Sequence, residues 1–105
     1  MAAAITKVGK GCLGSQFAPT ASTDLVMDVV NAVADGTTVT INTKVHATPQ
    51  IDNVHTPLAV IPIATNDGGT AGLYWAYSAG VITITGATAI ASTDTFNITI
   101  IGTAS

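Results

Sequence analysis

Apolar and polar residues alternate one by one in several stretches of the chain, which is the period of a β-strand with one buried face. In residues 37–46, Val39, Ile41 and Val45 fall on one side, while threonine, asparagine, lysine and histidine fall on the other. The same alternation predicts strands at 81–85 and 95–101. Their inward residues are Ile82, Ile84, Phe96, Ile98 and Ile100.

Glycine, asparagine and proline mark the ends of further strands. Ala79 and Gly80 separate residues 74–78 from 81–85, so we predict a hairpin at this point.

A second turn, at 66–69, separates an extended segment at 57–64 from the strand before the hairpin. Pro57 and Pro62 flank the apolar part of this segment. Proline donates no backbone hydrogen bond, so we expect residues 57–64 at the edge of a sheet.

Residues 24–34 fit two elements. A cap at Thr23 or Asp24 would begin a helix with one apolar face. The valines of this segment favour a strand instead, so we predict a strand at 25–33. A tight turn at 35–36 would then close a hairpin onto the next strand.

The segment 9–23 contains residues that interrupt regular structure, namely Gly9, Gly11, Gly14 and Pro19. We therefore predict an irregular N-terminal arm over residues 1–22 and one domain over residues 23–105. Frequent turns without alternating helices indicate an all-β fold. The sequence predicts a small antiparallel β-sandwich, jelly-roll or Greek-key like, of about seven or eight short strands.

Charge is scarce in this chain of 105 residues. Charged residues make up 9%, against about 25% in ordinary soluble domains, and comprise three lysines and six aspartates, with no arginine or glutamate. Interface cores are depleted of charge, so copies of the chain or a partner could cover much of the surface. A surface of threonine, serine and asparagine is the alternative. With so few cations we expect no nucleic-acid partner.

Two further classes are disfavoured by pattern. No apolar run reaches the length of about 18 residues that spans a bilayer, and no basic amphipathic stretch is present, so we expect no membrane partner. The first residues lack the charged and apolar regions of a signal peptide. We therefore expect synthesis in a cytoplasm. Cys12 is the single cysteine, so no intramolecular disulfide is possible.

Residues 9–14 match the G-x-G-x-x-G pattern of dinucleotide sites. That motif works at the junction of a strand and a helix in a βαβ unit, and here Pro19 and a Ser/Thr-rich stretch follow. Cys12 with His46 or His55 could form a nucleophile and base. No family signature surrounds them, so we expect no catalytic residues.

The sequence gives equally little support for a metal site or for a pair of catalytic carboxyl groups. The two histidines and an aspartate could in principle bind zinc, but the spacing does not demand it. All of the aspartates except Asp28 lie beside glycine, serine, threonine or asparagine, where turns and caps explain them better than paired carboxyls do. No EF-hand calcium loop is present. We therefore expect no metal and no cofactor.

The sole aromatic cluster is Tyr74, Trp75 and Tyr77. On a strand, Trp75 and Tyr77 face one way and Tyr74 the other. One side would fill the core and the other would lie at a subunit interface, where aromatic residues are enriched. Stacking on sugar rings is the alternative, typical of a carbohydrate-binding module.

The closing strands resemble a known family. Residues 80–86 and 91–102, in a chain rich in alanine, threonine, isoleucine and glycine, resemble the C-terminal strands of capsid decoration (cement) proteins of tailed bacteriophages. The resemblance implies a homotrimeric β-sandwich that binds the major capsid protein lattice, belongs to the virion and has no catalytic residues. Phage tail-tube and head-fibre proteins are similar in style.

The sequence thus favours a non-enzymatic viral structural protein of the decoration type. A carbohydrate- or surface-binding module and, more remotely, a small hydrolase are the alternatives.

Overall fold

A computed structural model describes residues 4–12, 25–34, 36–66, 72–87 and 90–104. These residues form seven β-strands and no helix, so the predicted all-β class is confirmed. The strands are β1 (Ala4–Cys12), β2 (Leu25–Val33), β3 (Val39–Asn42), β4 (Thr56–Ala64), β5 (Leu73–Ser78), β6 (Val81–Gly86) and β7 (Thr95–Thr103).

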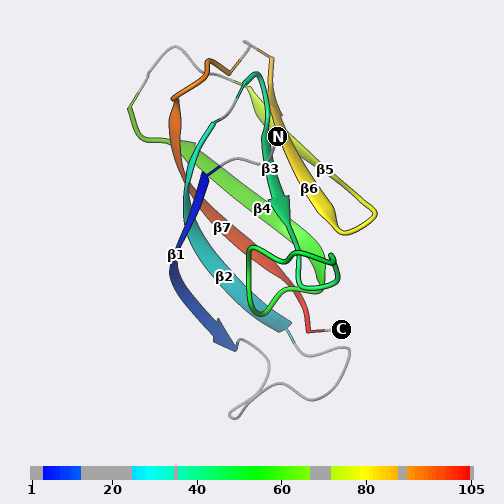
Figure 1. The fold of residues 1–105 in the computed structure, drawn as a ribbon. Coiled ribbons are helices and arrows are strands. Elements are labelled where there is room, and N and C mark those ends of the chain that lie inside the picture. The colour runs from blue at the N-terminus through cyan, green and yellow to red at the C-terminus, as the bar shows by residue number, and fades with distance from the viewer. Residues whose placement is uncertain (1–3, 13–24, 35, 67–71, 88–89, 105) are drawn as a thin grey trace.

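The strands form two antiparallel sheets (Figure 1). One has four strands in the order β1-β2-β7-β4, and the other has three in the order β3-β6-β5. Together they make the predicted small β-sandwich. The order has a simple origin, because β2 pairs with β7, β3 pairs with β6, and β4 contacts β5. The chain is therefore one long hairpin, β2-β3-β4 against β5-β6-β7, rolled up as in a jelly roll.

The core lies between the two sheets and follows the predicted alternation. In β7, every second residue from Phe96 to Gly102 is buried, and in β2 Val26 and Val30 face the same interior. Ile51 and Val54, from the long β3–β4 connection, are also buried and cover one end of the sandwich. The largest fully buried side chains of the strands are Phe96, Ile41, Ile82, Ile84, Ile98, Ile100, Val26, Val30 and Val39.

Two local predictions are confirmed. Residues 25–33 form a strand, and β5 and β6 form a hairpin around Ala79 and Gly80. Both turn residues have positive φ, of 50° and 80°, which is the backbone that a two-residue hairpin turn with the right twist requires.

The edge position of β4 is confirmed, since it pairs only with β7. The backbone N–H of Thr65 bonds to the carbonyl of Thr95. In an antiparallel ladder alternate residues bond to the same neighbour, so Ile61 and Ile63 bond toward β7. Pro62, between them, therefore directs its nitrogen to the free edge, where no N–H is needed.

The predicted N-terminal arm is wrong for residues 4–12. They form β1 and pair with β2 along its length, with a register shift between Lys7 and Gly9. Gly9 and Gly11 do not break the strand because glycine can adopt extended backbone, and the partner strand supplies the hydrogen bonds. The other residues of the predicted arm, 1–3 and 13–22, lie outside the described residues.

Two predictions around residues 35–46 are also wrong. The strand there ends at Asn42, and Val45 is 47% exposed in a loop. β2 and β3 do not form a hairpin, because β3 pairs with β6 in the opposite sheet. The chain crosses from one sheet to the other between β2 and β3. The side of β2 that a hairpin partner would have taken pairs instead with β7, at nine positions. Asp35 of the expected turn, and residues 67–69 of the other, lie outside the described residues.

Candidate functional site

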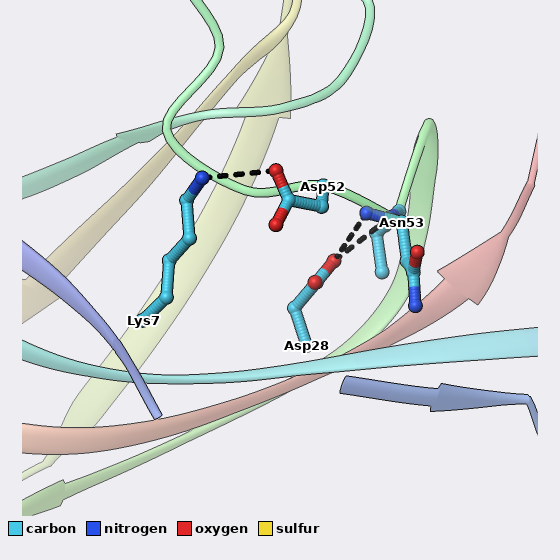
Figure 2. Close-up of polar contacts among 5 residues, drawn as sticks. Lys7, Asp28, Asp52 and Asn53 are labelled. Atoms are coloured by element: carbon cyan, nitrogen blue, oxygen red, sulfur yellow. Dashed lines mark hydrogen bonds and ion pairs between the residues drawn. The ribbon is translucent and has the colours of Figure 1, made fainter. Parts of the chain in front are cut away.

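A cluster of charged and polar groups joins the β3–β4 loop to β1 and β2 (Figure 2). Asp28 lies at an inward position of β2 and is 4% exposed. Its Oδ2 accepts hydrogen bonds from the backbone nitrogens of Asn53, at 3.1 Å, and Val54, at 2.8 Å. A buried carboxylate is tolerated when such donors surround it. Asp28 therefore fastens the loop to the sheet.

A second contact holds the same loop to β1. Lys7 Nζ lies 2.9 Å from Asp52 Oδ1, and both side chains are about half exposed. A surface pocket of about 160 Å³ lies between this ion pair and Asp28. The donors that face Asp28 are the two backbone N–H groups of the loop. This geometry accounts for the cluster as a structural tie, and it offers no acid–base pair positioned for catalysis.

The sequence contains an indication that Asp28 has a structural role. It occupies an inward position of the predicted strand 25–33, between Val26 and Val30, and it is the aspartate that turn chemistry did not explain. An acidic residue on a buried face requires specific donors, although nothing local indicated that residues 53 and 54 supply them.

Cys12 and His55 are placed far apart. Cys12, Val26, Gly102 and Pro57 are successive partners across the four-stranded sheet. At about 4.8 Å per strand, the backbones of Cys12 and Pro57 are roughly 14 Å apart. His55 lies two residues before Pro57, so the fold does not bring Cys12 and His55 together.

The histidines have local partners. His46 Nδ1 accepts a hydrogen bond from the backbone N–H of Thr48, at 3.0 Å, within their own loop. His55 Nδ1 lies 3.0 Å from Thr56 Oγ1. Within the described part of the chain, no group of three His, Cys, Asp or Glu residues is placed to hold a metal.

The remaining sequence candidates are structural where they are described. Asp94 Oδ2 accepts the N–H of Ala91 at 3.0 Å, which is the turn role expected for it. Gly9 and Gly11 lie inside a strand, whereas a dinucleotide motif places its glycines between a strand and a helix. Among the described residues, no helix has the length and apolar character for a membrane crossing.

The aromatic cluster divides as its alternation predicts. Trp75 and Tyr77 are half-buried and pack against the core, and the Tyr77 hydroxyl donates to the carbonyl oxygen of His55 at 3.3 Å. Tyr74 faces outward and is 56% exposed. A sugar platform would therefore have one exposed ring on this strand.

The outer face of the four-stranded sheet is unusual in composition. Three rows of neighbouring residues cross it, and we call them together the uncharged face. They are Met27–Ile101–Ala59, Val29–Thr99–Ile61 and Asn31–Asn97–Ile63. Ile61 and Ile63 are 49% and 57% exposed. The face carries no charged side chain, and sequence reasoning missed it because it scored only the inward residues of each strand.

The outer face of the three-stranded sheet also carries no charge in its rows, but it is more polar. Its rows are Tyr74–Thr85, Ala76–Thr83–Thr40 and Ser78–Val81–Asn42. Hydroxyl and amide groups dominate, as on the solvated side of an ordinary antiparallel sheet. The two sides of the sandwich therefore differ, and the uncharged face is the one whose composition indicates a contact.

The chain matches no known family model, no curated protein and no solved structure in the three comparisons that we made.

Proposed function

We propose that this chain is a non-enzymatic structural protein of a virus, a capsid decoration protein that stabilises the head lattice of a tailed bacteriophage. The observation that carries the assembly role is the uncharged face. Large exposed apolar patches on small proteins mark contacts with other proteins. On β4, Leu58, Ile61 and Ile63 are each about half exposed or more, on a molecule with little charge to keep it dispersed.

The mechanism is burial of surface across subunit boundaries. Each Å² of apolar surface removed from water contributes roughly 25 cal/mol. A head lattice presents many equivalent positions, so contacts that are individually weak add up through avidity. The tie between Asp28 and the β3–β4 loop supports this role, because a rigid sandwich transmits load between the subunits that it joins.

The phage assignment rests on the resemblance of residues 80–86 and 91–102 to decoration proteins. In the sandwich, these residues form β6, the turn around Asp94 and most of β7. They include the central strand of the uncharged face.

The carbohydrate-binding alternative has less support. Ring-stacking sites use exposed aromatic faces, and here Trp75 and Tyr77 pack against the core. A glycan-binding screen decides this point. Retention on a glycan that is lost in Tyr74→Ala, with the fold intact, would favour the alternative.

The proposal is tested by immunogold electron microscopy of particles released from cells that express the gene in its native setting. We expect regularly spaced label on the surface of heads. Label confined to tails would identify a tail component instead. Protein that stays unattached to any particle would refute the virion role.

A further inference from the structure

We propose that the uncharged face binds the same face of a second copy of this chain, so that two four-stranded sheets stack in a symmetric pair. The inference rests on the proposed function only in taking the chain to be an assembly protein, and it differs from the homotrimer that the resemblance to decoration proteins implies. It names the partner of one surface, and it leaves the rest of the molecule free for other contacts.

The chemistry of the face is self-complementary. A charged partner surface would lose hydration here and find no opposite charge, since the three rows contain only aliphatic, methionine, asparagine and threonine side chains. The same face of a second copy brings no charge to bury. Its aliphatic residues, led by Ile61, Ile63 and Ile101, offer the matching apolar surface.

The two asparagines of the face are hydrogen-bonded to each other. Asn97 Nδ2 donates to Asn31 Oδ1 at 3.1 Å, across β7 and β2. Thr65 Oγ1 and Thr95 Oγ1 lie 2.6 Å apart at the end of the same face. Groups that are already hydrogen-bonded cost less to cover than unpaired ones. The asparagine pair can therefore lie inside a contact.

The area is sufficient for a pair. The uncharged face lies within the outer side of the four-stranded sheet. The four strands have nine residues each, and at about 4.8 Å between strands and 3.3 Å per residue this whole side, β1 included, spans roughly 600 Å². Two stacked faces would bury about 1,200 Å², which is the lower end of the range for stable protein interfaces. Stacked sheets lie about 10 Å apart with interdigitated side chains, and a hollow of about 350 Å³ beside Asn31 and Val33 gives room for them.

Other routes to self-association are less favourable. Addition of a strand at β4 meets Pro62, which provides no N–H near the end of the free edge. The outer face of the three-stranded sheet bears Thr40, Thr83 and Thr85, whose hydroxyl groups would lose hydration in a contact. Stacking through the uncharged face is therefore favoured over contact through either of these two surfaces.

Sedimentation velocity of the full chain tests the pair, with two variants of the face and a matched control. Ile61→Lys places a lysine on the uncharged face, and Val33→Lys places one in the next outward row, where Val33 pairs with Thr95. Both positions are at least 40% exposed in the single chain, so the fold should survive. Tyr74→Lys introduces the same charge on the other sheet, at a position that is 56% exposed. Far-UV circular dichroism checks that each variant is folded.

We expect the wild type and Tyr74→Lys to sediment at twice the chain mass of 10.5 kDa. Ile61→Lys and Val33→Lys should sediment as single chains. Their dissociation constants should rise by about 100-fold or more, because two uncompensated lysines are buried in each pair.

A wild type that stays a single chain at hundred-micromolar concentration, or that forms three copies, overturns the pair. Face variants that keep the wild-type mass overturn it as well. The immunogold labelling of particles tests the proposed function independently of the pair. A pair that binds no particle refutes the decoration role alone, and a single chain that coats heads refutes the pair alone.

Discussion

Oδ2 of Asp28 and the backbone nitrogen of Val54 lie 2.8 Å apart, although 26 residues separate them in the chain. The same oxygen accepts the N–H of Asn53. One carboxylate thus holds two consecutive amides of a loop that has no regular structure of its own. Through this bond β2 fixes the segment that carries Ile51 and Val54 into the end of the core.

Asp28→Ala should lower the free energy of unfolding by about 2–3 kcal/mol, because a buried N–H is left without an acceptor. Asp28→Asn retains an acceptor oxygen of nearly the same shape and should cost less. Chemical denaturation of both variants measures the difference. Equal losses would mean that charge rather than the acceptor matters.

Lys7→Ala should have a small effect by comparison. The ion pair with Asp52 is about half exposed, and such pairs contribute about 0–1 kcal/mol. Lys7→Met, which keeps most of the aliphatic stem, separates packing from charge. Urea unfolding at low and high salt is the measurement. A loss as large as that of Asp28→Ala would show that the pocket beside Lys7 is more tightly coupled to the loop than its exposure indicates.

Gly102 and Gly9 should respond differently to the same substitution. A Cβ at Gly102 would overlap the Thr56 carbonyl oxygen and lie 2.7 Å from Val54 Cγ1, whereas one at Gly9 would meet no atom within 4 Å. Gly102→Ala should therefore cost about 1–3 kcal/mol or more. Gly9→Ala should change stability by less than about 1 kcal/mol. Thermal melts of the two variants decide this, and similar melting temperatures would contradict the close approach of β7 to β4.

Truncation of the core should cost far more than removal of the histidines. Ile98 is fully buried, so Ile98→Ala should lose about 2–5 kcal/mol through lost transfer energy and a cavity. Truncation of Ile41, Ile84 or Phe96 to alanine should cause a loss of the same size, because these side chains are buried as well. His46→Ala should cost less than about 1 kcal/mol, since it removes only exposed hydrogen bonds to Thr48. Melting curves and particle binding are measured together. A histidine variant that melts normally yet fails to bind would reveal a functional site at that residue.

Removal of residues 1–12 should destabilise the protein, because β2 loses the partner that pairs with it from Val26 to Val33. The uncovered strand edge would also promote aggregation. Thermal melts and static light scattering test both effects, with removal of residues 1–3 as the control. A truncated chain that melts like the full one would show that β1 adds nothing to the fold.

The sequence predicted the parts of the fold that local pattern controls. Alternation placed Ile82, Ile84, Phe96, Ile98 and Ile100 inward, and all are buried. Proline chemistry placed 57–64 at an edge. Ala79–Gly80 identified the hairpin, since the turn and both strands are contiguous.

Pairing between distant segments was beyond such reasoning. Whether residues 4–12 form a strand depends on β2 having a free side, and glycine content alone suggested the opposite. The uncharged face depends on which strands are neighbours, because Ile61, Val29 and Ile101 are remote in sequence. The acceptor role of Asp28 likewise required the path of the β3–β4 loop.

Pro62 has a consequence for how the molecule can grow into larger structures. An edge strand with a complete set of donors accepts another edge, and the newly added strand offers the next one, so growth of this kind is open-ended. A pair that buries one face against its equal is closed at two. By removing a single donor from the free edge of β4, the chain disfavours growth through that edge, and crowded copies can still meet through their faces. A protein of low charge at high local density would then stay as discrete particles where an unprotected sheet would polymerise.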